Sequence, residues 1–286
     1  MIASVGIISK PRKEVIAEVA PPLVAWLRAR KIAVLLDEET AQVCAPREKH
    51  LSREDLASKV ALLIVLGGDG TLLAAARLLD SHRVPILAVN LGSLGFLTSV
   101  TLEELYPLLE DVLAGRHQTS ERLMLEALVT RAGKSVERLL ALNDAVITKA
   151  AMARIIDLDV HVDTAFVGRF RADGLIVSTP TGSTAYSLAA GGPIVYPELD
   201  AFVITPICPH MLTNRPLVIP DSCCVRIELV SGDEPVHLTL DGQTGCELHK
   251  DDRVEVTKSA SRVLLVRPPK KTFYEILRNK LLWGER

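Results

Sequence analysis

The fold is decided by one stretch of sequence, Leu62-Leu63-Ile64-Val65-Leu66-Gly67-Gly68-Asp69-Gly70-Thr71-Leu72-Leu73. The run Ala61–Leu66 contains no polar residue, as expected for a parallel strand that is covered on both faces. Glycines follow the strand directly, and the segment from Thr71 to Asp80 has a helical composition. A strand, a glycine turn and a helix in this order predict free backbone N–H groups at a sheet edge, where a phosphate can bind. Glycine allows positive φ there and lets a phosphate approach the backbone.

The segments around this stretch alternate between strand and helix patterns. Strands are predicted at Ile2–Ile8, Lys31–Leu36 and Val84–Asn90, and helices at Arg12–Arg30, Thr71–Asp80 and Thr101–Gly115. Pro21-Pro22 is expected to break or restart the first helix. Thr101 and Glu104 have the spacing of a capping box. The alternation predicts an α/β nucleotide domain at residues 1–118, with a parallel sheet and flanking helices.

The pattern changes at about Ser120. Short strands rich in Val, Ile and Leu are predicted at Leu123–Thr130, Val136–Leu142, Ile155–Val162, Leu175–Ser178, Leu217–Ile219, Val225–Val230, Val236–Leu240, Arg253–Lys258 and Val263–Val266. This predicts an all-β, sandwich-like domain at residues 119–269. The tail, residues 270–286, is helical in pattern, and we expect it to pack back on the first domain.

Composition narrows the class of protein. The formal net charge of the 286 residues is −2, which gives no general attraction to nucleic acid or to an anionic membrane. No segment approaches the ~20 apolar residues of a membrane span. The five cysteines form no C-x-x-C pair, which argues against a disulfide framework or a zinc site. We therefore expect a cytoplasmic protein with no nucleic-acid or membrane partner.

Asp69 is unusual in a phosphate-binding turn, because a carboxylate repels phosphate. One interpretation is a tight turn in which Asp69 caps the helix. The other is a base that accepts a proton from a hydroxyl attacking a phosphoryl group. The chain has no G-x-x-x-x-G-K-[ST] loop, so it is not a P-loop enzyme. The Gly67–Gly70 turn resembles that of diacylglycerol and sphingosine kinases, phosphofructokinases and NAD kinases, which indicates a superfamily but no substrate.

A second stretch is more specific. Pro180-Thr181-Gly182-Ser183-Thr184-Ala185-Tyr186 follows a strand with hydroxyls and small residues that suit ribose and phosphate, and Tyr186 offers an aromatic face to a base. Without a ligand, it would be a Ser/Thr-rich turn. This run resembles the NAD kinase signature almost throughout, whereas lipid kinases lack it. Further matches follow in the family's order: Asn90-Leu91-Gly92-Ser93-Leu94-Gly95-Phe96-Leu97-Thr98, Asn143-Asp144, Thr205-Pro206-Ile207-Cys208-Pro209-His210, Asn214-Arg215-Pro216 and Asp241-Gly242-Gln243.

The resemblance to NAD kinases implies an activity and its partners. Family members transfer the terminal phosphoryl group of ATP, or of polyphosphate in some members, to the 2′-hydroxyl of the adenosine ribose of NAD. Mg²⁺ is implied as a cofactor that binds through ATP, with no metal site on the protein. A homodimer or homotetramer is implied, in which a neighbouring subunit completes the NAD site. A lipid kinase and a non-catalytic NAD(P)-binding sensor remain the alternatives.

The resemblance also assigns roles to residues of the matching motifs. Asp69 is implied as the catalytic proton acceptor. The loop implied to hold the donor phosphates is Gly67, Gly68, Gly70 and Thr71. NAD contacts are implied for Asp69, Gly70, Phe96, Asn143, Asp144, Arg154, Arg171, Asp173, Thr184, Ala185, Tyr186, Ser187, Leu188, Ala189 and Gln243.

Simpler interpretations exist for several of these residues. Phe96 could be a core residue, Asn143-Asp144 an ordinary turn, and Arg154 and Gln243 solvated surface. His210 is expected to have a structural role. Asp144 stands where the family usually has glutamate, and it is shorter by one methylene, about 1.5 Å. Arg171 resembles members that prefer NAD over NADH, and it predicts that preference here.

Overall fold

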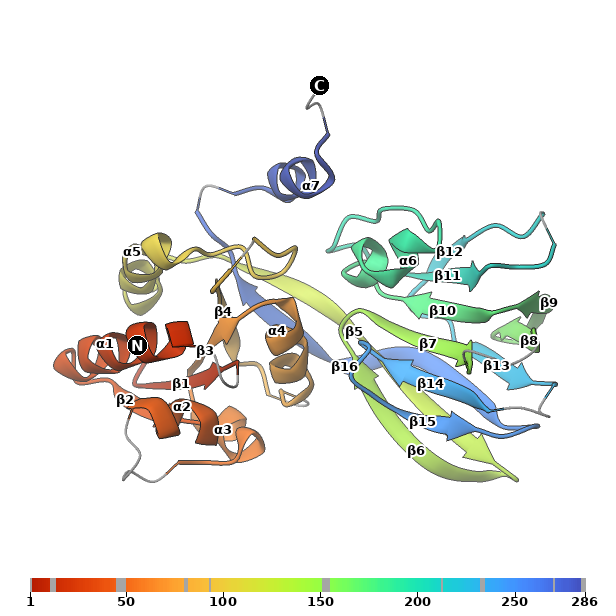
Figure 1. Ribbon diagram of the computed structural model, residues 1–286, viewed down its shortest axis with the longest axis horizontal. Coiled ribbons are helices and arrows are strands. Elements are labelled where there is room, and N and C mark those ends of the chain that lie inside the picture. The colour runs from red at the N-terminus through yellow and green to blue at the C-terminus, as the bar shows by residue number, and fades with distance from the viewer. Residues whose placement is uncertain are drawn as a thin grey trace. The chain divides into compact units, whose positions relative to one another are not determined.

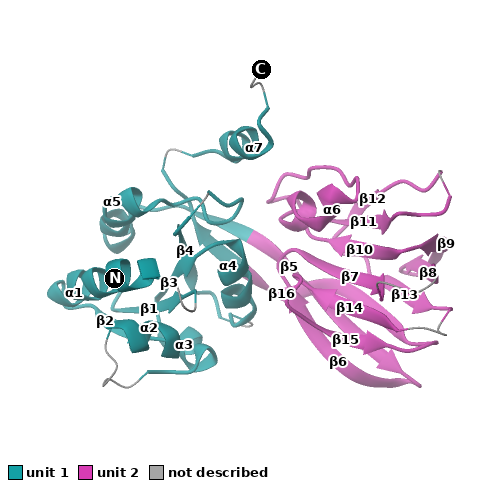
Figure 2. Cartoon of the chain, in the orientation of Figure 1, with its two compact units in different colours: residues 1–121, 263–286 teal, residues 122–262 magenta. Residues whose placement is uncertain are grey.

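The computed structural model describes residues 2–10, 14–44, 50–79, 82–92, 94–150, 155–211, 213–231, 235–269 and 271–283. Figure 1 shows the succession of helices and strands along the chain. The chain divides into two compact units, which Figure 2 colours separately. Unit 1 comprises Met1–Glu121 and Val263–Arg286, and unit 2 comprises Arg122–Arg262.

Unit 1 is built on a parallel sheet. Its strands are β1 (Ser4–Ser9), β2 (Ala33–Leu36), β3 (Leu62–Gly67) and β4 (Pro85–Asn90), in the order β2-β1-β3-β4. The end of β16 (Arg253–Val266) pairs with β4 in the same direction. Every residue of β3 is buried, as expected for a strand covered on both faces. The predicted parallel sheet is confirmed.

Helices flank this sheet. They are α1 (Glu14–Ala29), α2 (Glu38–Cys44), α3 (Arg53–Lys59), α4 (Asp69–Arg77) and α5 (Leu102–Leu113). The helix α7 (Phe273–Leu281) follows β16 and lies apart from this sheet (Figure 1). The predicted break at Pro21-Pro22 is wrong, because α1 continues through both prolines. Leu23, Val24 and Leu27 lie in the core, so packing outweighs the lost backbone hydrogen bonds.

The N-terminus of α5 has the predicted cap. The backbone N–H of Thr101 donates to Glu104 Oε2 over 2.9 Å. The same carboxylate accepts from Lys271 Nζ over 2.6 Å, and Lys271 Nζ also donates to the carbonyl of Ser99 over 2.8 Å. Lys271 directly precedes Thr272, the N-cap of α7, so these bonds attach the start of α7 to unit 1. The short helices α2 and α3 were not expected from the sequence.

Unit 2 is antiparallel and all-β. One sheet has the order β12-β11-β10-β7-β14-β15, and in the other β16-β13-β8-β9 lie in order, with β5 on β16 and β6 on β5. The strands are β5 (Thr119–Arg131), β6 (Lys134–Ala141), β7 (Asp144–Lys149), β8 (Ile156–Val162), β9 (Ala165–Ala172), β10 (Gly174–Ser178), β11 (Ala201–Ile207), β12 (Leu217–Pro220), β13 (Val225–Leu229), β14 (Val236–Leu240) and β15 (Thr244–Leu248). One core takes Leu125 and Ile227 from one sheet and Ile147 and Leu175 from the other. The expected all-β, sandwich-like fold is confirmed.

Two details of unit 2 correct the sequence analysis. The segments predicted as separate strands at Arg253–Lys258 and Val263–Val266 form the single strand β16. Ser259 and Ser261 between them are buried, and the Ser259 hydroxyl accepts from the Ser261 backbone N–H over 3.1 Å within the strand. The strands β7, β9, β11 and β15 were not predicted. Among the described residues, no helix is long and apolar enough to cross a membrane.

Candidate functional site

The turn between β3 and α4 starts the helix earlier than predicted. Gly68 is the N-cap and Asp69 is already the first helical residue. Gly68 has φ −112°, and none of Gly67, Gly68 and Gly70 uses the positive φ that glycine allows. The carbonyl of Gly68 accepts from the backbone N–H groups of Thr71 (3.0 Å) and Leu72 (3.2 Å), which closes the first turn.

The Asp69 carboxylate does not cap its own helix. Oδ2 accepts from the backbone N–H of Phe96 over 2.9 Å. Oδ1 accepts from the backbone N–H groups of Leu97 (3.2 Å) and Thr98 (2.9 Å), and from the Thr98 hydroxyl (2.8 Å). A Cβ on Gly95 would lie 2.0 Å from Asp69 Oδ1, so only glycine allows this approach. The carboxylate is therefore held in one place by the motif at residues 90–98, which is the second motif of unit 1.

The rest of that motif is also ordered by hydrogen bonds. Asn90, the last residue of β4, accepts from the Gly92 N–H over 2.6 Å and donates to the Thr98 hydroxyl over 2.9 Å. Phe96 is half-buried, and Lys280 Nζ of α7 lies 5.9 Å from its ring centre.

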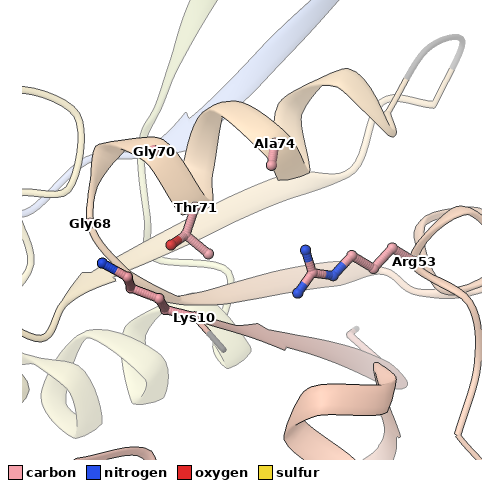
Figure 3. A pocket seen from close by; sticks show the side chains of 6 residues that line it. All are labelled: Lys10, Arg53, Gly68, Gly70, Thr71 and Ala74. Carbon is pink, nitrogen blue, oxygen red and sulfur yellow. The ribbon is translucent and has the colours of Figure 1, made fainter. Parts of the chain in front are cut away.

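A pocket opens beside the glycine turn. It has a volume of about 270 Å³ and is lined by Lys10, Arg53, Gly68, Gly70, Thr71 and Ala74. Figure 3 shows the side chains of Lys10, Thr71 and Arg53 pointing into the space beside the first turn of α4. The sequence analysis missed Lys10 and Arg53. Lys10 could have been found, because it follows the first predicted strand at the same sheet edge as the turn.

In unit 2, the segment before β7 is held by Asp241. Its carboxylate accepts from the backbone N–H groups of Leu142 (3.2 Å), Asn143 (2.7 Å) and Asp144 (3.4 Å). Asp241 has φ +53°, the left-handed conformation that Asp tolerates better than most residues. Its own N–H donates to the carbonyl of Asp144 over 3.0 Å. Asp241 was quoted only as part of a motif, and its positioning role was missed.

Asp144 is 4% exposed. Burial, with a smaller contribution from the Asp241 charge, raises the pKa of Asp144 to about 7. Among the described residues, we find no hydrogen bond that stabilises its charged form. Near neutral pH, Asp144 can therefore either donate or accept a hydrogen bond.

The hydroxyl-rich loop packs directly on Asn143. The carbonyl of Asn143 accepts from the Thr179 N–H over 2.8 Å, and a Cβ on Gly182 would lie 2.1 Å from that oxygen. The loop continues as a 3₁₀ turn, Gly182–Thr184, and the short helix α6, Tyr186–Ala189. The Thr181 hydroxyl is buried and lacks a hydrogen-bond partner among the described residues.

The six residues expected to cradle the adenylate do not share one environment. Ser187 is buried, and its hydroxyl lies 2.9 Å from that of Thr205, which indicates a structural role. Tyr186 is 45% exposed, and Ala189 is also exposed. Thr184, Ala185 and Leu188 are half-buried.

The remaining predicted NAD contacts lie elsewhere in unit 2. Asp173 forms an ion pair with Lys149, whose Nζ lies 3.0 Å from Asp173 Oδ1. Arg171 is exposed, and its carbonyl accepts from the His210 N–H over 2.8 Å. Gln243 is exposed in the turn after β14. Arg154 lies outside the described residues.

Each unit thus brings part of the predicted set together. Unit 1 holds Asp69 and the glycine turn beside a cationic pocket, and unit 2 holds Asn143 and Asp144 beside the hydroxyl-rich loop. In unit 1, a fixed carboxylate beside a cationic pocket can accept a proton from a hydroxyl that reacts with an anionic group. In unit 2, clustered amide and hydroxyl groups can hydrogen-bond a nucleoside. Within the described ranges, no group of three His, Cys, Asp or Glu side chains could hold a metal ion.

Comparisons with known proteins agree in both units. Residues 5–117 match the family described as ATP-NAD kinase N-terminal domain, and residues 142–268 match the ATP-NAD kinase C-terminal domain. The NAD kinase of Solibacter usitatus is 48% identical over 286 residues, covering 100% of this chain and 99% of the relative. The NAD kinase of Syntrophotalea carbinolica is 51% identical over 282 residues and covers 99% of both chains.

Solved structures show the same fold. A yeast NADH kinase complexed with NADH has a TM-score of 0.91 at 28% identity, covering 100% of this chain and 89% of its own. An NAD kinase from Archaeoglobus fulgidus in complex with ATP has a TM-score of 0.76 at 23% identity, covering 96% of this chain and 98% of its own. At that identity, the archaeal structure supports the fold alone.

Proposed function

This chain belongs to the ATP-NAD kinase family and phosphorylates NAD to NADP with ATP, and we propose that Asp69 is the base of that reaction. The observation that carries the proposal is the fixed carboxylate beside the cationic pocket. Among the residues that the structure describes, Oδ1 of Asp69 accepts three hydrogen bonds, whereas Oδ2 accepts one, from Phe96. A carboxylate oxygen has two lone-pair positions, so Oδ2 keeps one for the 2′-hydroxyl proton of the adenosine ribose.

The donor phosphates are assigned to the turn of Gly67, Gly68, Gly70 and Thr71. Gly68 and Gly70 line the pocket, and the N-terminus of α4 directs backbone N–H groups and a positive dipole toward it. Mg²⁺ is part of the donor, bound through ATP oxygens, and offsets their charge. Adding excess EDTA should abolish NADP formation, and restoring Mg²⁺ should recover it. Full activity in EDTA would contradict the metal assignment.

The adenosine of NAD is assigned to unit 2. Asp144 begins β7 and Asn143 precedes it, beside the loop that carries Thr184, Ala185 and Tyr186. These side chains offer an amide, a carboxyl, a hydroxyl and an aromatic face. Leu188 and Ala189 complete the surface of α6. Ser187 supports the loop from within instead of contacting NAD, because its hydroxyl is buried against Thr205.

The nicotinamide half is assigned to Asp173, Arg171 and Gln243, with Arg154 as a cation for the pyrophosphate, in a site that a second subunit completes. The exposed apolar side chain of Phe166 lies on β9, an edge strand of its sheet, which suits pairing between copies of the chain. A homodimer or homotetramer is expected, and light scattering after gel filtration tests it. A monomer that is fully active would contradict the shared site.

Preference for NAD over NADH is assigned to Arg171, which is exposed and free to meet a ligand. The Arg171→Gly variant should accept NADH more readily, whereas its turnover of NAD should change less. Equal turnover of NAD and NADH by the unaltered protein would refute the assignment.

One assay tests the proposed chemistry against its alternatives. Purified protein is incubated with NAD, ATP and Mg²⁺, and NADP is measured with an NADP-specific dehydrogenase. Formation of NADP, and of no phosphorylated diacylglycerol or sphingoid base in parallel reactions, is the expected result. Binding of NAD without turnover would instead favour a sensor.

A further inference from the structure

The pocket of unit 1 contains two cations that belong to neither kinase motif. We propose that Lys10 and Arg53 bind the phosphate chain of the donor, and that the buried Asp37 positions Arg53 for this contact. The inference rests on the proposed function, because it extends the donor site beyond the glycine turn. The ligand is a chain of linked phosphates, which either ATP or inorganic polyphosphate could supply.

The Nε and Nη2 atoms of Arg53 are bound by neighbouring residues. Its Nε donates to Asp37 Oδ2 over 2.9 Å. Its Nη2 donates to the carbonyl of Ser9 over 3.2 Å and lies 3.1 Å from Glu39 Oε2. Among the described residues, Nη1 has no such partner, and the side chain is 26% exposed and lines the pocket. The guanidinium is therefore fixed in orientation while one nitrogen remains available for a phosphate oxygen.

Asp37 gives Arg53 this fixed position. Its side chain is 0% exposed and lies just after β2, at the carboxyl edge of the parallel sheet. It accepts from the Thr40 backbone N–H over 3.0 Å and from the Thr40 hydroxyl, which also lies 2.9 Å from the Ser9 hydroxyl. Burial holds the pKa of Asp37 above its ordinary value, although the hydrogen bonds from Thr40 and the charge of Arg53 oppose this rise. The ion pair keeps Arg53 in place, because moving the guanidinium away would leave the buried Asp37 charge unpaired.

Lys10 completes the cationic side of the pocket. It follows β1 directly, and its backbone N–H donates to the carbonyl of Leu66 over 3.0 Å, which keeps it beside the end of β3. Its ammonium group forms no ion pair with any residue that the structure describes, and it is exposed. A Cβ on Gly68 would meet no atom within 4 Å, so the glycine adjoins open space.

These features together describe a site for a polyanion. The volume of about 270 Å³ is close to the lower end of small-ligand pockets, about 300 Å³. Lys10, Arg53 and the α4 N-terminus supply positive potential around it, in a chain whose net charge is −2. Thr71 adds a hydroxyl donor. The pocket thus combines a guanidinium fixed by Asp37 with an exposed ammonium group.

The test separates donor binding from NAD binding. Steady-state kinetics are measured for Arg53→Gln, Lys10→Gln and the matched control Lys59→Gln, which removes a 52% exposed cation from the same helix as Arg53. Arg53→Gln and Lys10→Gln should each raise the KM for ATP about 10-fold or more, since each removes a charge-assisted hydrogen bond. The KM for NAD should stay within about 2-fold, and Lys59→Gln should change neither constant.

Inorganic tripolyphosphate separates contacts to phosphate from contacts to the nucleoside. It should inhibit competitively with ATP, and its inhibition constant should rise in Arg53→Gln and Lys10→Gln by the same factor as the KM for ATP. Long-chain polyphosphate in place of ATP then shows which source the site accepts as a donor. A higher KM for ATP with unchanged tripolyphosphate inhibition would overturn the assignment to the phosphate chain.

Asp37→Asn tests the positioning role. It should raise the KM for ATP about 5-fold with little change in the KM for NAD. Arg53→Lys keeps the charge but loses the planar guanidinium, so its KM for ATP should lie between those of the unaltered protein and Arg53→Gln. If Asp37→Asn does not fold, Glu39→Gln, which loosens the same guanidinium from its exposed side, should give a smaller rise in the KM for ATP.

Two outcomes distinguish a wrong proposed function from a wrong assignment of the donor pocket. If the unaltered protein makes no NADP, the proposed function is wrong. If it makes NADP, but the Lys10 and Arg53 variants keep the KM for ATP or raise both KM values equally, the pocket does not bind the donor.

Discussion

Asp69 in unit 1 and Asp144 in unit 2 are the two carboxyl groups at the centre of the predicted motifs, and their surroundings are opposite. Asp69 accepts four hydrogen bonds from residues 96–98. Asp144 is buried next to Asp241, and its pKa rises to about 7. The same side chain is thus a fixed acceptor in one unit and a titrating group in the other.

The difference lies in the backbone nearby. In unit 1, the loop after β4 directs its N–H groups at Asp69 itself. In unit 2, the corresponding N–H groups point at Asp241, and Asp144 contributes one of them instead of receiving any. The backbone donors fix the Asp69 carboxylate in position, which suits a residue that must meet a substrate hydroxyl in one geometry.

The largest expected effect is on Asp69. Asp69→Asn should lower kcat by roughly 10²–10⁴, because the amide cannot take the ribose proton, while the affinity for NAD should change little. Stopped assays of NADP formation and NAD binding by calorimetry measure the two quantities.

The control separates the base from the loop anchor. Thr98→Val removes the hydroxyl that lies 2.8 Å from Asp69 Oδ1 and leaves the carboxylate in place. It should lower kcat by less than about 10-fold. If Thr98→Val costs as much as Asp69→Asn, the carboxylate acts by holding the loop.

The second effect concerns the pH dependence of stability. The pKa of Asp144 is raised from 3.8 to about 7, so between these values the folded protein keeps a proton that the unfolded chain releases. Stability relative to Asp144→Asn should therefore fall as pH rises from about 4 to 7 and stay constant above, by up to about 4 kcal/mol in total. Urea unfolding of both proteins across this range measures it. Parallel pH profiles would show that Asp144 is charged throughout.

The contrast between the units also shows what the sequence could predict. The apolar run Ala61–Leu66 and the glycines after it predicted the β3–α4 turn, since a buried parallel strand and a helix leave strong local patterns. The resemblance located Asn143 and Asp144. Short helices such as α3 were missed, because seven residues carry little periodicity.

The partners of these residues were harder to predict. Arg53 reaches the glycine turn only because α3 and β1 lie at the same sheet edge, and its ion pair with Asp37 depends on that packing. Asp69 was interpreted as a cap of its own helix or as a base, and neither interpretation included its donors, which come from a loop after another strand. Local sequence determines elements, whereas contacts between distant segments determine which polar groups are satisfied.

The third effect is on Asp241. In Asp241→Asn, the acceptor Oδ1 can be retained, but the amide nitrogen then faces the N–H of Leu142, which is buried. The unpaired donor should reduce the free energy of unfolding by about 1–3 kcal/mol. It should also raise the KM for NAD, because Asn143 and Asp144 lose their anchor. A normal KM for NAD would mean that the turn does not position the adenosine contacts.

The smallest effect should come from the pair of Lys149 and Asp173, which are 21% and 39% exposed at the side chain. Partly solvated pairs of this kind contribute about 0–1 kcal/mol, so Asp173→Asn should leave the melting temperature nearly unchanged, unlike Asp241→Asn. If Asp173 meets the nicotinamide half, the same variant should still raise the KM for NAD. If Asp173→Asn alters stability but not the KM for NAD, Asp173 is a structural carboxylate like Asp241. Asp144 would then be the carboxyl group of unit 2 that binds the ligand.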